Sequence, residues 1–410
     1  MRKINTVSFR RATRSTAREV NRQIALNLVR EHQPVSRADL ARRMKIGRGV
    51  VTSLIGELLE EGAIYEGDTV DAPRGRKPRM LYVRTRDRLV VSIDVRLSRT
   101  YVMLGDFAGT QIAFETFETI LDPEALAREL VRRINRVIAT HGAAGACEGI
   151  GLVVPGMVDR ATGRVIHAPQ LGWRDVDVRG PIAKGTGLPV HIENAPIACA
   201  LAQMWLGTRG EGNGDFVYVT VGDGVGAGIV INGEVVRGRD HTAGEFGHIP
   251  MVPAGMANDG PECLCGARGC WEVYTSNIAT LSRYLGRELP AGASRAQLQS
   301  MPLTMVDLVG RARAGEPRAV AALEETARHL GEGLGVIINT LNPGQIFVGG
   351  EITALWEQLE PTIRAAVEAR VLTRAAASTP IVPEQVGGMP RLRGATALVA
   401  APQFAAPQVG

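Results

Sequence analysis

The apolar positions in the first sixty residues follow the period of three short helices. From residue 17 to 31, the apolar side chains share one helical face: Val20, Ile24, Leu28 and Val29. Ser36 and Asp39 then form a capping box that opens a second helix over 39–45. A third helix ends at Gly62 and turns four apolar side chains inward: Val51, Leu54, Leu58 and Leu59. Three short helices with a tight turn between the last two predict a helix-turn-helix.

A hairpin pattern follows the third helix. Ile64 and Tyr65 begin a strand, residues 81–83 form its return partner, and a basic loop, 73–79, lies between them. This pattern predicts the wing of a winged helix-turn-helix whose third helix enters the major groove of double-stranded DNA. We expect DNA contacts from the first turns of that helix and from the wing: Arg48, Thr52, Ser53, Arg74, Arg76 and Lys77. The plainer alternative is a three-helix bundle with a charged linker and no role in DNA binding.

Beyond residue 88 the pattern changes to strands that alternate with helices, with glycine turns at the strand ends. The expected helices cover 123–140, 196–207 and 318–340. The expected strands lie within 89–95, 100–109, 111–119, 149–159, 188–195, 216–236 and 345–350. Such alternating blocks predict two α/β lobes with a cleft between them. The tail from Val399 is expected to be loose at its end.

Composition and charge divide the chain in two. With 410 residues, 45% of them hydrophobic and 22% charged, the chain has room for two or three globular domains. No apolar run is long enough for a membrane span, and the basic first eighteen residues lack the apolar core of a secretory signal, so a cytoplasmic protein is expected. Residues 1–88 contain twenty Lys and Arg against ten Asp and Glu, whereas the rest contains twenty-seven against thirty-two. This division suggests a basic module for nucleic acid on an acidic body.

Three of the five cysteines lie within eight residues, in the stretch from Gly244 to Glu272. A histidine fifteen residues upstream completes a set of three thiolates and one imidazole: His248, Cys263, Cys265 and Cys270. Four protein ligands leave no open position for water, so the spacing predicts a structural Zn²⁺ site rather than a catalytic one. Free thiols or a disulfide are the alternatives, and a disulfide is the poorer of the two without a secretory signal.

The motifs GEFGH, over 244–248, and CLCGARGCWE, over 263–272, resemble the ROK family of repressors and sugar kinases. The resemblance covers most of the chain and extends to the family's repressor branch. It implies an actin-like or hexokinase-like α/β domain of two lobes, preceded by a winged helix, with a sugar in the cleft. We therefore expect the winged helix-turn-helix over 1–85, the first lobe over 86–195 with 385–410, and the second lobe, with the zinc site, over 196–384.

The resemblance also implies which residues hold the sugar: Asn194, Glu245, His248, Glu272 and Gly156, with Gln170 as a weaker candidate. Carboxylates and an imidazole suit this role because they can hold several hydroxyl groups by hydrogen bonds in a fixed geometry. His248 would serve the metal as well as the sugar.

Three departures from the family's kinases argue against phosphoryl transfer. Ala195 stands where the kinases have the aspartate that takes the proton of the sugar hydroxyl, and a methyl group accepts no proton. Residues 94–98 replace a glycine-rich phosphate loop with Asp-Val-Arg-Leu-Ser. Asp223 replaces a threonine in the second phosphate loop, where its charge would repel a triphosphate. On the nucleotide side, only the Gly349-Gly350 turn remains.

These features favour a sugar-responsive transcriptional regulator, a repressor by analogy with the family, that is not an enzyme. Its partners would be a double-stranded DNA operator, a sugar or sugar-derivative effector, and further copies of the chain in a homodimer or tetramer, because each winged helix occupies one half-site. An ATP-dependent sugar kinase with an accessory DNA-binding domain is the alternative. A third is a DNA-binding protein whose cleft no longer binds any ligand.

Overall fold

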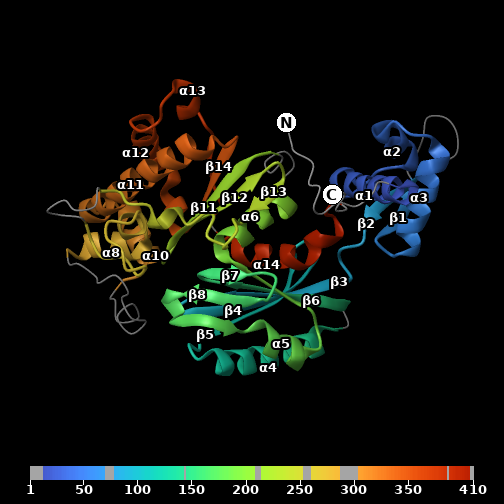
Figure 1. Ribbon diagram of the computed structural model, residues 1–410, viewed down its shortest axis with the longest axis horizontal. Coiled ribbons are helices and arrows are strands. Elements are labelled where there is room, and N and C mark those ends of the chain that lie inside the picture. The colour runs from blue at the N-terminus through green and yellow to red at the C-terminus, as the bar shows by residue number, and fades with distance from the viewer. Residues whose placement is uncertain are drawn as a thin grey trace.

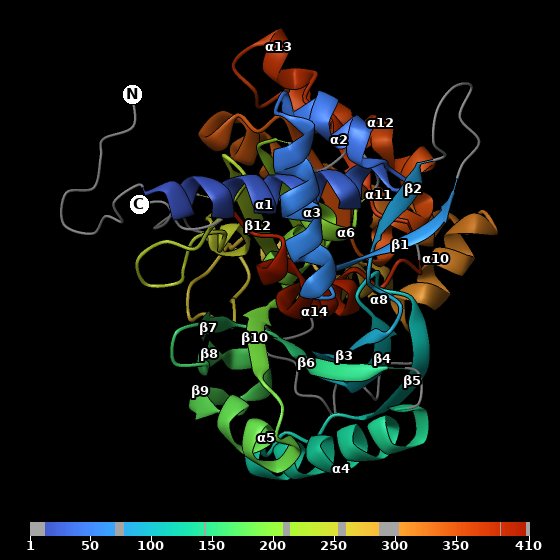
Figure 2. The same cartoon turned by 90° about the vertical axis from the view of Figure 1, so that its right-hand side faces the viewer.

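The computed structural model describes residues 13–69, 78–142, 145–207, 214–252, 260–286, 303–385 and 387–406. A small N-terminal unit, which we call the head (residues 13–83), stands at one side of a larger two-lobed body (Figures 1 and 2). Each lobe of the body is built on a five-stranded sheet. No helix within these ranges is both long and apolar enough to cross a membrane.

The head contains three helices and an antiparallel strand pair: α1 (Arg14–His32), α2 (Arg37–Met44), α3 (Arg48–Glu60), β1 (Ile64–Thr69) and β2 (Arg79–Val83). The predicted capping box of α2 is confirmed, because Ser36 Oγ accepts the N–H of Asp39 and the Asp39 carboxylate accepts the N–H of Ser36. Lys45, in the left-handed conformation, ends α2 and makes the tight turn into α3. The three helices and the hairpin that the sequence predicted are therefore present.

The core of the head differs from the prediction at one position. Val51, Leu54 and Leu58 are fully buried, as expected, but Ile24 is 44% exposed. Ala25 is fully buried instead, whereas Val29 is fully buried as predicted. The buried face of α1, which packs on α2, α3 and β2, therefore includes Ala25 in place of Ile24.

Lobe 1 is a five-stranded sheet with the order β10-β6-β3-β4-β5, in which β3 and β10 run parallel to β6, and β4 runs antiparallel to both of its neighbours, β3 and β5. α4 and α5 cover one face of the sheet, and α14 covers the other (Figure 1). A small sheet, β7-β8-β9, follows β6. The bounds are β3 (Arg88–Val95), β4 (Arg99–Asp106), β5 (Gln111–Glu118), α4 (Pro123–His141), β6 (Ala146–Val154), β7 (Met157–Asp159), β8 (Arg164–Ala168), η2 (Pro169–Leu171), β9 (Trp173–Asp177), α5 (Arg179–Thr186), β10 (Val190–Asn194) and α14 (Pro390–Ala400).

Lobe 2 has the strand order β13-β12-β11-β14-β15, in which β11 and β15 run parallel to β14, and β12 runs antiparallel to both of its neighbours, β11 and β13. Its hydrophobic core lies between this sheet and α8, α10, α11 and α12. The bounds are β11 (Phe216–Val221), β12 (Val225–Ile231), β13 (Glu234–Val236), η3 (Phe246–His248), α7 (Glu272–Thr275), α8 (Asn277–Leu285), α10 (Met305–Arg313), α11 (Pro317–Leu341), β14 (Gln345–Gly349), η4 (Glu351–Leu355), α12 (Trp356–Glu368), α13 (Arg374–Ala377) and β15 (Ile381–Pro383).

Two helices pack against each other between the sheets: α14, on lobe 1, and α6 (Ala195–Leu206), on β11 and β12 of lobe 2. Glycines make this packing possible. A Cβ on Gly394 of α14 would lie 2.2 Å from the Ala198 carbonyl oxygen of α6, and one on Gly151 of β6 would lie 1.9 Å from the Ala395 carbonyl oxygen. Any side chain at these positions would push the layers apart, so the α6–α14 pair sits tightly at the centre of the body.

Candidate functional site

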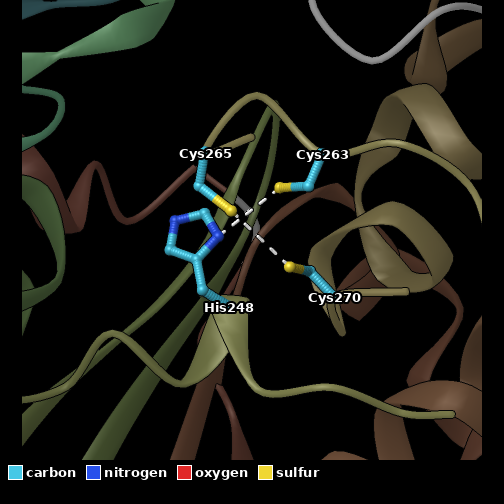
Figure 3. Close-up of side chains that lie close together, drawn as sticks. All are labelled: His248, Cys263, Cys265 and Cys270. Atoms are coloured by element: carbon cyan, nitrogen blue, oxygen red, sulfur yellow. Dashed lines mark hydrogen bonds between the residues drawn. The ribbon is translucent and has the colours of Figure 1, made fainter. Parts of the chain in front are cut away.

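The predicted metal ligands converge in lobe 2. His248 ends the short helix η3, and the three cysteines come from the loop that follows; the four ligand atoms lie within 4.8 Å of one another (Figure 3). The loop turns at Gly266 and Gly269, both with positive φ, and the Cys263 N–H donates to the Ala267 carbonyl at 2.8 Å. Positive φ is the conformation for which glycine is suited, so the glycines allow the sulfurs to meet.

The separations within the cluster fit a tetrahedral zinc. Bond lengths of about 2.3 Å to sulfur and about 2.05 Å to nitrogen, at tetrahedral angles, place two sulfurs about 3.8 Å apart and a sulfur and a nitrogen about 3.6 Å apart. The Sγ atoms of Cys265 and Cys270 are 3.7 Å apart, and Cys263 Sγ lies 3.5 Å from His248 Nδ1. Sulfur and imidazole donors without a carboxylate are the set that zinc prefers. These four side chains could hold a metal ion.

The residue between Cys270 and Glu272 anchors the metal loop to the body. Trp271 is fully buried, and its indole N–H donates to the His329 carbonyl on α11 at 2.7 Å. A Cβ on Gly333, also on α11, would lie 1.9 Å from the Trp271 ring. α11 therefore has a glycine where the indole lies against it, and the loop is held to the core of lobe 2.

Both acids that flank the cysteine loop lie beside the cluster. Glu245 Oε2 is 3.8 Å from His248 Nε2, the ring nitrogen that points away from the cysteines. Glu272 Oε1 is 4.0 Å from Cys263 Sγ, and its Oε2 accepts the N–H of Val225 at 2.8 Å. Burial raises the pKa of both carboxyl groups above their usual range. Glu245, Glu272 and His248 thus form one wall next to the metal cluster, which we call the acidic wall.

Lobe 1 contributes Asn194, the last residue of β10 and the N-cap of α6. Its side-chain oxygen accepts the Ile197 N–H at 3.1 Å, which leaves the amide NH₂ as the donor group. Pro196, two residues later, abuts Gly226 of β12: a Cβ on that glycine would lie 2.7 Å from Pro196 Cγ. Gly226 follows Val225, the partner of Glu272. Asn194 and Glu272 therefore both lie near the start of β12.

Two charged residues that the sequence did not single out connect the lobes beside Asn194. Glu193, only 2% exposed, accepts the backbone N–H of Asn194 at 3.0 Å. Its second carboxylate oxygen accepts hydrogen bonds from Arg237 of lobe 2, at 2.9 Å from Nη2 and 3.1 Å from Nε. Glu193 was visible next to Asn194, but no sequence spacing connects it to a partner forty-four residues away.

Two further candidates lie on the loops of lobe 1. Gly156 has a φ of +86°, and a Cβ there would fall 2.1 Å from the His167 carbonyl oxygen, so the approach of β8 already requires this glycine. Gln170 is better placed than the sequence indicated. A Cβ on Gly224 would lie 2.7 Å from Gln170 Nε2 and 2.8 Å from Glu272 Oε2. Gln170 of lobe 1 and Glu272 of lobe 2 thus border the same point.

An ion-pair cluster occupies the segment that the resemblance to the family's kinases matched to their first phosphate loop. Asp94 is fully buried, with its oxygens 2.7 Å from Arg96 Nε and 2.8 Å from Arg391 Nε of α14. Burial, reinforced by Glu351, raises the pKa of Asp223 in the second loop, and both arginines oppose this rise. The Gly349-Gly350 turn has a structural role, because a Cβ on Gly350 would lie 1.8 Å from the Val221 carbonyl oxygen.

The predicted DNA-contacting residues on α3 are exposed. Thr52 donates to the Arg48 carbonyl at 2.9 Å, and Ser53 accepts a hydrogen bond from Arg18 of α1 at 2.8 Å. Arg48 and Thr52 line a hollow with five other residues: Ser36, Arg37, Ala38, Pro78 and Arg79. Two of these residues, Arg37 and Arg79, are lining residues that the sequence did not single out, and both pair with Glu66. Arg74, Arg76 and Lys77 of the wing lie outside the described residues.

Comparison with known proteins gives consistent results. A model of the ROK family matches residues 90–401. The chain is 27% identical to the xylose repressor of Bacillus subtilis (strain 168) over 92% of this chain and 94% of that protein. It is 34% identical to a glucokinase of Halalkalibacterium halodurans over 59% of this chain and 72% of the glucokinase. The crystal structure of a ROK family transcriptional regulator, a homolog of the Escherichia coli MLC protein, aligns with a TM-score of 0.77 at 25% identity and covers 95% of this chain and 97% of its own.

Proposed function

The chain belongs to the ROK family, and from this premise we propose that it is a sugar-responsive, DNA-binding transcriptional repressor whose body binds a sugar without phosphorylating it. The observation that carries the proposal is the pairing of Asp94 with Arg96 and Arg391. Ion pairs occupy the loop that would have to receive nucleotide phosphates, while the acidic wall for a sugar is retained. A relative named a repressor that matches head and body together supports the same function.

The sugar would lie between Asn194 of lobe 1 and the wall of lobe 2. Asn194 offers a donor, Glu245 and Glu272 offer acceptors for hydroxyl groups, and His248, whose Nδ1 faces the metal, offers its Nε2–H as a donor. Gly156 would allow the backbone of lobe 1 to approach the sugar. Zn²⁺ on His248 and the three cysteines would fix this wall in place, with no open position for chemistry. Glu245, 3.8 Å from the ring nitrogen of His248 that faces away from the metal, would help to orient this ligand.

The head would bind an operator through α3. Arg48 and Thr52 lie at its exposed N-terminal end, the part of a recognition helix that meets base edges, and Ser53 follows on the same helix. Arg74, Arg76 and Lys77 would contact phosphates or the minor groove. One head covers one half-site, so we propose a homodimer or a tetramer on DNA. A sugar that binds one lobe arrangement better than another would then alter the spacing of the heads.

A thermal-shift screen followed by DNA titration tests this function. The purified protein is screened against D-xylose, D-glucose, N-acetyl-D-glucosamine and their phosphates, with and without ATP and Mg²⁺. We expect a shift with one sugar class and none with ATP. That sugar should then weaken binding to a duplex selected from a random library by the wild-type protein. Phosphorylation of a sugar by the wild-type protein would contradict the proposal and support the kinase alternative.

The residue test compares two exposed arginines. Arg48→Ala should weaken binding to the selected duplex by at least about fivefold, because one good base contact contributes about 1–3 kcal/mol of discrimination. Arg128→Ala, on α4 of lobe 1, is the control and should leave binding unchanged. If the two variants bind the duplex with equal affinity, α3 is not part of the DNA interface.

A further inference from the structure

The head rests on the body through a small surface that we call the seat: Trp205, Gln403 and Phe404. Trp205 lies in the last turn of α6, and Gln403 and Phe404 follow α14 through the turn η5 (Ala401–Gln403). Phe404 is 7% exposed and belongs to the hydrophobic cluster of the head, with Ala25 and Val29 of α1. The rings of Trp205 and Phe404 are 6.4 Å apart. A side chain from the C-terminal end thus completes the core of the N-terminal domain.

One face of α1 makes the polar contacts with the seat. The Arg30 guanidinium lies 4.8 Å from the Trp205 ring centre and 4.9 Å from that of Phe404, so one cation contacts both aromatic rings. Asn27 donates to the Phe404 carbonyl at 2.8 Å, and Gln23 donates to the Gln403 carbonyl. Two amide hydrogen bonds and one cation between rings make a small and partly polar contact, of the kind across which domains move.

The seat is also tied to lobe 1. Arg88 at the start of β3 donates to the Gln403 side chain, whose amide donates to Glu148 at 3.2 Å. Arg393 of α14 donates to the Leu206 carbonyl at the end of α6. Because Gly394 lets α14 pack directly on the backbone of α6, the two helices form one unit that ends at the seat.

The other end of this unit lies at the proposed sugar site. α6 begins at Asn194, its N-cap and the proposed sugar residue, and reaches Trp205 after about 16 Å of helix. Arg391, in the first turn of α14, contacts Asp94 in the former phosphate loop. A helix whose N-cap belongs to the proposed sugar site and whose last turn contacts the head connects the two directly rather than through a chain of loops.

We propose that the seat positions the DNA-binding head and that α6 transmits effector-driven movement from Asn194 to Trp205, which turns the head. The second part rests on the proposed function, because it requires a sugar in the cleft. Arg30 is the positioning residue on the head. It contacts neither the proposed sugar site nor the exposed hollow on α3.

Hydrogen exchange on the full-length protein tests the seat without any ligand. The amides of Phe404 and Ala405 bond to the Ala401 carbonyl and report on η5. Arg30→Met keeps the aliphatic stem but removes the cation, and exchange at 404–405 should become at least about tenfold faster. Arg22→Met is the matched control, since Arg22 is on the same helix but pairs with Glu61 inside the head. Its exchange at 404–405 should stay within about twofold of the wild type.

The outcomes separate the two parts of the proposal. If exchange at 404–405 is unchanged in Arg30→Met, the proposal that the seat positions the head is refuted. If Arg30→Met also accelerates exchange in α3, the head itself is loosened. In that case exchange at 404–405 is measured in Asn27→Ala instead, a variant that removes one hydrogen bond to the seat. A sugar that stabilises the wild type should alter exchange at 404–405, and binding without this change refutes the α6 link. If no sugar in the screen binds, both the proposed effector class and the α6 link are refuted. The exchange experiment without ligand still tests whether the seat positions the head.

Discussion

Replacing one cysteine of the cluster tests whether the four side chains hold zinc. Cys265→Ser is the most informative change because Cys265 is the exposed member, so the substitution leaves the surrounding packing intact. Serine is a poor zinc ligand, and its oxygen sits on a shorter bond than sulfur does. The 3.7 Å contact with Cys270 could therefore no longer place both atoms at bonding distance from one ion.

The magnitude follows from mass action. A metal present at about one hundred times its dissociation constant stabilises the folded state by about 2.7 kcal/mol. Domains of 150–250 residues lose about 2–4 °C of melting temperature per kcal/mol. The metal-free variant should therefore melt about 5–11 °C below the wild type. Wild-type protein stripped by a chelator should show a drop of similar size, since both lack the same ion.

The assay combines elemental analysis after dialysis with thermal unfolding. We expect one zinc per chain in the wild type and well below one in Cys265→Ser. Cys147→Ser is the control, because Cys147 lies outside the cluster, with its Sγ 3.7 Å from the Gly149 carbonyl. Wild-type zinc content in the Cys265→Ser protein, or a wild type that retains no zinc, would refute the metal assignment.

Three more predictions concern charged groups. The folded-state pKa of Asp223 is raised, so its ionised form costs stability once the pH rises through that pKa; Asp223→Asn should melt higher than the wild type at pH 7, and the difference should vanish below the usual aspartate pKa. Glu193→Gln should lower the free energy of unfolding in urea by about 3 kcal/mol by leaving Arg237 uncompensated, whereas Arg239→Met, at an exposed pair in the same loop, should change it by under about 0.5 kcal/mol. Ala195→Asp should restore no sugar phosphorylation from ATP in a coupled assay, because Arg96 and Arg391 still hold Asp94; turnover would show that the missing base alone prevents catalysis.

Local patterns predicted most of the head and the metal cluster. The Ser36–Asp39 capping box, the turn at Lys45 and the hairpin are set by neighbours in the sequence, and the structure shows all three. The cluster was predictable because three of its four ligands lie within eight residues. On α1, the prediction placed Ile24 inward, but which face of a helix is buried depends on what packs against it.

Contacts between segments far apart in the sequence could not be predicted from it. The expected strands of both sheets are present, but the sheet β7-β8-β9 and α14 were not predicted. Arg391 sits nearly three hundred residues from Asp94, so the ion pair that fills the former phosphate loop has no sequence signature. The tail was expected to be loose at its end, and residues 407–410 lie outside the described ranges. Phe404, only a few residues earlier, is buried against the head.

The burial of Phe404 has a consequence for how the protein is made. Domains usually fold in the order in which they leave the ribosome, and the head would emerge first. Its hydrophobic cluster, however, contains a side chain that is translated about three hundred residues after the head. The head can therefore complete its core only after both lobes of the body have been synthesised. A truncated product that stops before residue 404 would carry an incomplete head, so synthesis of the whole body is a condition for a properly seated head.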